Sequence, residues 1–192
     1  MQTVLNNDEA IARIAETLAR SHSVLFITGA GISADSGLPT YRGIGGLYNV
    51  NTTEDGMPIE RALSGEIIYE QPELTWKYLR QIEKNCRGAQ PNRGHEVISE
   101  MQNHFKRLWV LTQNVDGLHK TAGARNVIDI HGDLHHLLCM RCDYRCTVDD
   151  YRELSFPPRC PHCEAILRPD VVLFGELLSQ QKVQCLIDEL NR

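Results

Sequence analysis

Residues 29–42 read Gly29-Ala30-Gly31-Ile32-Ser33-Ala34-Asp35-Ser36-Gly37-Leu38-Pro39-Thr40-Tyr41-Arg42, and they directly follow a short apolar run at 24–27. A buried strand that ends in small residues is how a doubly wound sheet offers backbone N–H groups to a phosphate. Ala34 occupies the third glycine position, so only the relaxed dinucleotide fingerprint is met. Ser33 or Ser36 is expected to cap a following helix. The stretch predicts a nucleotide site, with an ordinary strand-to-helix turn as the alternative.

Composition places the chain among ordinary globular domains. Of its 192 residues, 42% are hydrophobic and 23% are charged, and no apolar run approaches the ~20 residues that span a bilayer. The net charge of −5 argues against a general nucleic-acid or membrane-surface binder. The N-terminus shows no basic and apolar leader, so a cytoplasmic location is expected. Seven cysteines without an export signal indicate reduced thiols, some of them holding a metal.

Apolar periodicity alternates between strand and helix along the chain. Strands are expected at 24–27, 108–112 and 127–130, and helices at 8–19, 59–69, 72–85 and 95–103. Residues 43–60 predict a long mobile loop with short helical pieces. The alternation predicts an α/β fold with a parallel, Rossmann-like sheet. Each expected strand ends in polar or glycine residues, at 29–33, at 113–116 and at His131. Ligands bind beyond the carboxyl ends of such strands, so the three segments should share one cleft.

Two cysteine pairs predict a metal site. Cys139-x2-Cys142 and Cys160-x2-Cys163 have the spacing of a four-cysteine tetrahedral zinc module. All four positions are filled by protein, so the Zn2+ should be structural. Competing ligands nearby are Cys146, His135, His136 and His162. A pair of disulfides would need an oxidising compartment.

In this order, the motifs resemble those of the sirtuins, the NAD-dependent protein lysine deacylases. The resemblance runs from about residue 8 to about residue 185, and its motifs are 29–33, 36–42, 112–119, His131-Gly132, the two cysteine pairs and 168–176. It implies NAD and Zn2+ as cofactors and an acyl-lysine protein or peptide as substrate. It also implies one catalytic domain over 1–192. Its expected parts are a Rossmann-like part (1–42, 95–134 and 168–192), a helical and cofactor-loop part (43–94) and a zinc-binding module (135–167).

The resemblance also assigns roles to residues. His131, Asn114 and Asp116 would be catalytic. NAD would contact Gly29, Ala30, Gly31, Ser33, Asp35, Tyr41, Arg42, Gln113, Asn114, Val115 and Asp116. The acyl-lysine would meet Val171, Val172, Phe174 and Gly175, where the backbone pairs with the peptide as an added strand. An imidazole can accept a proton near neutral pH, which suits His131 to deprotonate a ribose hydroxyl.

Two departures from the family pattern qualify these expectations. The helix at 72–82 lacks the Tyr-x-x-Arg pair of members that prefer acidic acyl groups, so a neutral acyl group is favoured. Only a helix capped by Ser179 is expected after Glu176, so the sheet should be C-terminally incomplete, with an apolar edge open to association. The expected function is acyl transfer from lysine to ADP-ribose with release of nicotinamide. The alternatives are a truncated, poorly active NAD- and peptide-binding module, or a protein ADP-ribosyltransferase that uses the same cleft.

Overall fold

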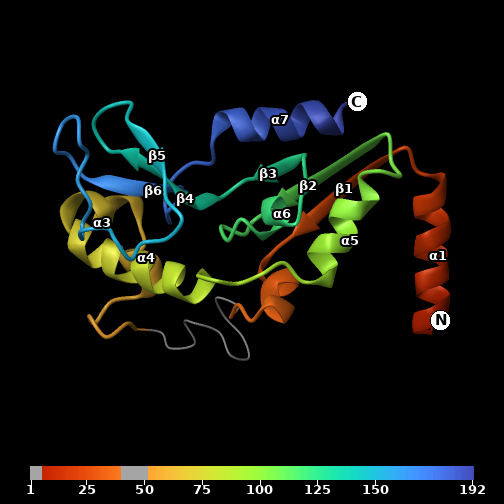
Figure 1. Cartoon of the computed structure of the whole chain (residues 1–192), viewed down its shortest axis with the longest axis horizontal. Helices are drawn as coiled ribbons and strands as arrows, with labels where there is room; N and C mark the ends of the chain where they lie inside the picture. The colour runs from red at the N-terminus through yellow and green to blue at the C-terminus, as the bar shows by residue number, and fades with distance from the viewer. Residues whose placement is uncertain (1–5, 40–51) are drawn as a thin grey trace.

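A three-stranded parallel sheet forms one half of the protein (Figure 1). The computed structural model describes residues 6–39 and 52–192. The strands β1 (Ser23–Thr28), β2 (Arg107–Thr112) and β3 (Val127–Asp129) lie in the order β1-β2-β3. Alternate residues of β2 are buried, among them Val110, as expected for a central strand. All three strands expected from the sequence are confirmed, and their carboxyl ends meet at one edge.

Helices α1 (Asn7–Arg20), α5 (Arg93–Met101), α6 (Leu118–Thr121) and α7 (Gln180–Leu190) accompany this sheet. The side chain of Asn6 accepts a hydrogen bond from the backbone N–H of Glu9, and Glu9 completes a capping box. Helix α1 stands apart at one end of the molecule and buries none of its residues (Figure 1). Ser179 caps α7, as expected. None of the helices in the described residues has both the length and the apolarity that crossing a bilayer requires.

A second, antiparallel sheet was not expected from the sequence. Its strands are β4 (Gly132–Cys139), β5 (Arg145–Thr147) and β6 (Leu167–Val171), in the order β5-β4-β6. A register shift interrupts the β4–β6 pairing between Asp133 and Leu137. Two of the strands are short and lie next to the cysteine pairs, so their sequences show little period-two alternation.

The main hydrophobic core joins this second sheet to helices α2 (Ile59–Ala62), α3 (Gly65–Glu70) and α4 (Pro72–Cys86). Trp76 of α4 is 1% exposed, packs edge-on against Tyr151 and donates its indole N–H to the Leu167 carbonyl at 2.9 Å. The expected single helix over 59–69 is two helices, because the chain turns at Ser64, whose side chain caps α3. Half of the expected loop at 43–60, residues 43–51, lies outside the described residues; residues 52–58 form turns, and α2 begins at Ile59.

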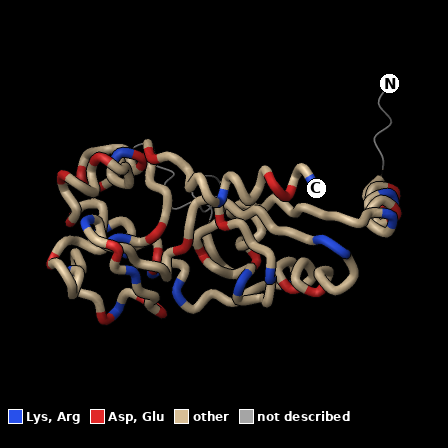
Figure 2. Tube along the Cα trace, turned by 90° about the horizontal axis from the view of Figure 1, so that it is seen from above, with Lys and Arg blue, Asp and Glu red and all other residues tan. Residues whose placement is uncertain are grey.

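Charged residues of both signs are interspersed along the described part of the chain (Figure 2). This mixed distribution agrees with the modest net charge of −5.

Candidate functional site

The glycine-rich segment leaves β1 and forms a short 3-10 helix, η1 (Ala30–Ser36). Among the described residues, a Cβ on Gly29 or Gly31 would meet no atom within 4 Å, so these residues leave this side of the backbone open. The expected capping by Ser33 or Ser36 is wrong, since Gly29 occupies the cap position. Both hydroxyls are engaged by other elements: Ser33 donates to Asp116 at 2.7 Å, and Ser36 accepts from Asn92 at 3.0 Å.

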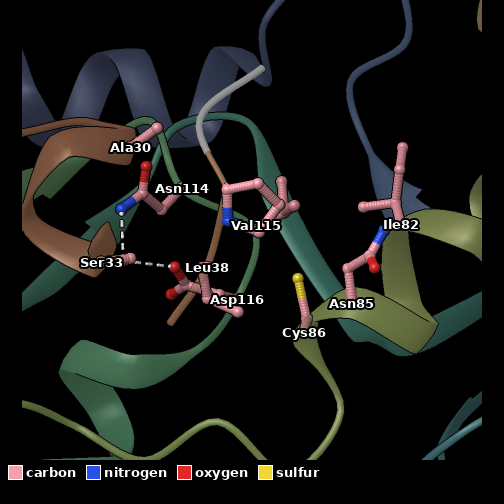
Figure 3. A pocket seen from close by; sticks show the side chains of 10 residues that line it. Ala30, Ser33, Leu38, Ile82, Asn85, Cys86, Asn114, Val115 and Asp116 are labelled. Atoms are coloured by element: carbon pink, nitrogen blue, oxygen red, sulfur yellow. Dashed lines mark hydrogen bonds between the residues drawn. The ribbon is translucent and has the colours of Figure 1, made fainter. Parts of the chain in front are cut away.

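Asn114 and Asp116 follow β2 and hold η1 in place (Figure 3). The Asn114 amide donates to the Gly29 carbonyl at 3.0 Å and to the Ser33 hydroxyl at 3.2 Å. The Asp116 carboxylate also accepts from the backbone N–H of Leu118 at 3.0 Å, which fixes its second oxygen. A cavity of about 40 Å³ lies among these residues, with Ala30, Val115 and Cys86 also in its wall. The polar residues after β1 and β2 therefore form one preorganised cluster.

His131 lies in the turn between β3 and β4 and lines a larger cavity of about 470 Å³. Its Nδ1 atom is 3.1 Å from the carbonyl oxygen of Gln113. Gln113, Asn114 and Val115 line the same cavity. Gly132 follows at φ +93°, and a Cβ there would overlap the Asp170 carbonyl oxygen, so only glycine allows this close approach of β4 to β6.

The segment after β6 forms the opposite wall of the larger cavity. Val171, Val172, Phe174 and Gly175 all line it. The backbone N–H of Val172 donates to the His131 carbonyl at 2.8 Å, and the N–H of Phe174 donates to the Leu63 carbonyl at 2.9 Å. Phe174 itself is 50% exposed. The segment therefore bridges the parallel sheet and the helical layer.

An ion pair between buried Arg168 and half-buried Glu176 holds this segment in place. Arg168, in β6, donates to the Glu176 carboxylate and, at 2.6 Å, to the Val171 carbonyl. Glu176 also accepts from the backbone N–H of Leu173 at 2.8 Å. The pKa of Glu176 lies below its ordinary value, because these donors outweigh the opposing effect of burial. The two side chains thus clamp residues 171–176 into one conformation.

Two buried histidines lie behind Asp116. His95 and His119 pack edge-on at 4.8 Å between ring centroids. His119 Nε2 contacts the Thr28 hydroxyl at 2.9 Å, and the Asn92 backbone N–H donates to His95 Nδ1 at 3.3 Å. Burial and, to a lesser extent, the neighbouring His95 together lower the pKa of His119 to about 4. Burial also lowers the pKa of His95. The sequence offers no signal for the role of His95 beyond its place in the capping box of α5.

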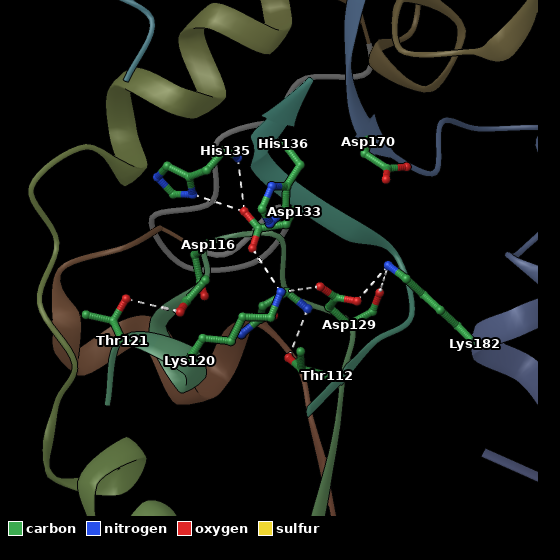
Figure 4. Close-up of polar contacts among 12 residues, drawn as sticks. Thr112, Asp116, Lys120, Thr121, Asp129, Asp133, His135, His136, Asp170 and Lys182 are labelled. Atoms are coloured by element: carbon green, nitrogen blue, oxygen red, sulfur yellow. Dashed lines mark hydrogen bonds and ion pairs between the residues drawn. The ribbon is translucent and has the colours of Figure 1, made fainter. Parts of the chain in front are cut away.

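An ion network joins α6, β3, β4 and α7 on the other side of the strand ends (Figure 4). Lys120 contacts Asp129 at 2.6 Å and Asp133 at 3.2 Å, and Lys182 of α7 contacts Asp129 at 2.6 Å. Asp133 also lies 3.0 Å from the His135 ring, which raises the pKa of His135. The network ties α7 to the parallel sheet through Lys182. It also binds the ring of His135, and His135 is not one of the residues in the metal cluster.

The four cysteines of the two pairs converge. Their sulfur atoms all lie within 4.8 Å of one another. Cys139 and Cys163 are 3.5 Å apart at Sγ, and Cys142 and Cys160 are 3.6 Å apart. A tetrahedral zinc with bonds of about 2.3 Å requires sulfur–sulfur distances near ~3.8 Å. The donor set therefore fits Zn2+ and leaves no open position, and Cys146, His135, His136 and His162 are not part of the cluster.

The structure brings most of the expected site residues together. Ala30, Gln113, Asn114, Val115, His131 and the segment 171–175 surround the larger cavity, while Ser33 and Asp116 line the smaller one. Gly29, Gly31 and the exposed Asp35 line neither cavity. Tyr41 and Arg42 lie outside the described residues.

Sequence comparison supports the same assignment. A sequence model described as the Sir2 family matches residues 29–192. NAD-dependent protein deacylase 2 of Pseudomonas aeruginosa is 48% identical over 191 residues, which cover 98% of this chain and 74% of that protein. The protein of the same name from Pseudomonas syringae is 48% identical over 179 residues, covering 92% of this chain and 72% of its own length.

Solved structures resemble the fold as well. A Sir2 homologue mutant in complex with ADP-ribose gives a TM-score of 0.83 at 34% identity, covering 94% of this chain and 70% of that chain. A Sir2 homologue–NAD complex gives 0.82, also at 34% identity, covering 94% and 68%. A Sir2 mutant with a deacetylated peptide and 3′-O-acetyl ADP-ribose gives 0.82 at 30% identity, covering 95% and 72%.

Proposed function

The chain belongs to the Sir2 family, and we propose that it is an NAD-dependent protein-lysine deacylase. The observation that carries this proposal is one cavity of about 470 Å³ shared by His131, Asn114 and the segment 171–176. On one wall, His131 is a proton acceptor and Asn114 carries an amide. The other wall is the backbone of residues 171–176, beside an apolar floor. Named relatives are NAD-dependent protein deacylases, which agrees with this combination.

The residues around η1 are suited to hold NAD. Open space beside Gly29 and Gly31 lets a ligand approach the backbone closely. Asn114 and Asp116 fix η1 through Ser33 and the Gly29 carbonyl, so the cradle is formed before the ligand arrives. When bound, NAD supplies the ADP-ribose that accepts the acyl group and the nicotinamide that leaves. We assign contacts with NAD to the residues that the family resemblance implies, including Asp35, Tyr41 and Arg42.

His131 is suited to act as the general base. A carbonyl oxygen only accepts, so the neutral ring donates from Nδ1 to Gln113 and leaves the Nε2 lone pair free. That atom can take a proton from a ribose hydroxyl of the nucleotide. Asn114 and Asp116 then act by orienting the groups that react.

The acyl-lysine would lie against residues 171–175, with the peptide backbone added as a strand. The floor of the cavity is apolar and is formed by Leu63, Leu79, Ile82, Leu134 and Leu173. Among the described residues, no lysine or arginine lines this cavity, and Glu176 is its acidic member. Burying an acidic acyl group there without a cationic partner would be costly, so the preferred acyl group is neutral.

The zinc module would serve the fold rather than the reaction, since its four thiolates leave no site for water or substrate. We retain the division into a Rossmann-like part (1–42, 95–134 and 168–192), a helical and cofactor-loop part (43–94) and a zinc-binding module (135–167). We also propose a cytoplasmic location.

The open side of the parallel sheet supports self-association. Among the described residues, β1 pairs only with β2, and Ile27 is 67% exposed on it. An unpaired strand edge is a template for a second chain. Light scattering that finds only monomers at high protein concentration would contradict this part of the proposal.

The main test is an assay on acetyl-lysine and succinyl-lysine versions of one peptide, with and without NAD. We expect nicotinamide release that requires both NAD and the acetyl peptide, together with an acetylated ADP-ribose product seen by mass spectrometry. The succinyl peptide should react much more slowly. Nicotinamide release without any acyl peptide would instead support ADP-ribosyl transfer. Binding of NAD and peptide without turnover would support a binding module.

A further inference from the structure

A second concave site lies between α4 and the loop around Arg152 and Phe156, with a volume of about 560 Å³. We propose that this site, the α4 cleft, binds a small molecule that carries several phosphate groups. Among the described residues, five cationic side chains and one acidic side chain, Glu73, line it. The cations are Lys77, Arg80, Lys84, Arg87 and Arg152.

Helical geometry places these cations in a row. Lys77, Arg80 and Lys84 are separated by three and four residues, so they project from one face over about 10 Å of helix. Arg87 follows directly after the helix ends. Arg152 approaches from the loop, so the cleft has positive charge on both walls. A multivalent anion bound between the two walls would be attracted by cations of both.

Two of the five cations have no carboxylate to neutralise them. Lys77 is paired with Glu54 and Asp55, Arg87 with Glu83, and Arg152 with Asp150. In the part of the chain that the structure describes, neither Arg80 nor Lys84 has an ion pair. The Arg80 guanidinium lies over the Phe156 ring at 4.5 Å from its centroid, which orients the group without using its N–H donors. These two side chains are available for a ligand.

The chemistry of the donors favours phosphate. Arg80, which has no carboxylate partner among the described residues, carries a planar fork that can match two oxygens of a phosphate at once, and Lys84 adds a second cation. The volume suits a small molecule. The acidic chain as a whole, at −5, disfavours a long nucleic acid, which would extend beyond the cleft.

The α4 cleft is separate from the catalytic cavity. Leu79 and Ile82 line the catalytic cavity, whereas Lys77, Arg80 and Lys84 line the cleft on the other face of the same helix. A ligand in the cleft would therefore contact α4 from behind without occupying the space of NAD or the acyl-lysine. The inference does not depend on the proposed enzymatic activity.

The experiment is calorimetric titration of the zinc-loaded chain with inorganic tripolyphosphate at low ionic strength. We expect saturable binding of one equivalent that weakens as salt is added. The double variant R80Q/K84Q should raise Kd by about tenfold or more, because two charge-assisted contacts are lost. The control R20Q/K106Q removes the same two charge types at exposed positions away from the cleft, and its Kd should be unchanged.

Several outcomes would overturn the proposal. These are the absence of saturable binding, an unchanged Kd in R80Q/K84Q, or an equal loss in R20Q/K106Q, which would indicate a general charge effect. Tighter binding of a single-stranded oligonucleotide than of tripolyphosphate, lost in the same double variant, would assign the cleft to nucleic acid instead.

Discussion

The Nδ1 atom of His131 lies 3.1 Å from the carbonyl oxygen of Gln113, the residue that directly follows β2. This contact ties the end of one strand to the next and selects the ring tautomer. With Nδ1 donating, Nε2 is left as the only proton acceptor of the neutral ring. The Gln113 carbonyl, just beyond β2, thus determines which nitrogen of His131 can accept a proton.

Replacing His131 by alanine should abolish that chemistry while sparing the fold. We expect the rate of deacylation to fall by about 10²–10⁴-fold, with NAD affinity changed only slightly. The matched control is His136→Ala, since His136 is an exposed histidine of β4, the next strand along the chain, and its ring contacts Thr147. Steady-state kinetics and NAD titration of both variants provide the measurement. Full activity in His131→Ala would remove the histidine from the reaction.

The ion pair of Arg168 with Glu176, the clamp that holds residues 171–176, gives a second prediction. Arg168→Met leaves Glu176 partly buried without its cation, and breaking such a pair costs about 3–5 kcal/mol of unfolding free energy. The control, Arg145→Met, removes an exposed pair with Asp170 on the same sheet and should cost less than about 1 kcal/mol. Denaturant unfolding of both proteins measures the difference.

Glu176→Gln tests the role of the same clamp in substrate binding with less disturbance of packing. Glutamine keeps one acceptor oxygen for the Leu173 N–H but loses the charge that holds Arg168. We expect KM for the acyl peptide to rise several-fold while KM for NAD changes little. Equal changes in both constants, or none, would show that the clamp does not position the peptide segment.

The buried histidines predict a loss of stability in mild acid. The folded-state pKa of His119, at about 4, lies below the unfolded value near ~6.5, and that of His95 is lowered too. Their contribution is therefore complete above about pH 6.5 and is lost as the pH falls toward about 4, with His119 accounting for on the order of 3 kcal/mol. His135 has a raised pKa, so its contribution has the opposite sign and is lost above about pH 6.5.

Unfolding by urea at intervals between pH 7.5 and pH 4.5 measures this dependence. His119→Gln should flatten the decline on the acid side, while His104→Gln, at an exposed position, should reproduce the decline of the unsubstituted protein. Equal slopes in all three proteins would show that the buried pair does not cause the acid sensitivity.

Metal removal should weaken the fold and, through it, the catalytic site. We expect one zinc per chain by elemental analysis, and chelation should lower both the unfolding temperature and the affinity for the acyl peptide. Cys142→Ser should lose the metal, whereas Cys146→Ser should keep it, because Cys146 lies outside the four-sulfur cluster. Retention of zinc by Cys142→Ser would move the ligand assignment to another side chain.

Much of this arrangement could be predicted from the sequence because its signals are local. The parallel strands are short apolar runs, and the cysteine spacing identifies the metal ligands directly. The shared cleft followed from the rule that parallel strands present their carboxyl ends at one edge. These inferences needed no knowledge of which distant side chains touch.

The features that the sequence did not predict depend on contacts between segments that are far apart in the chain. The hydroxyls of Ser33 and Ser36 were expected to cap a helix, but Asp116 and Asn92 engage them from elsewhere in the chain. His95 carries no local mark of its packing against His119, and the break at Ser64 reflects pairing with Phe174. The second sheet likewise depends on pairing across the cysteine segment, where alternation is weak.

The pairing of β4 with β6 has a broader consequence. Val172 donates its backbone N–H to the His131 carbonyl, and Gly132 pairs with Val171, so main-chain atoms set the spacing between the base and the peptide segment. The side chains of Val172 and Phe174 take no part in that spacing. Substitutions at Val172 and Phe174 can therefore change which substrate is preferred and leave the distance between His131 and the peptide segment unchanged.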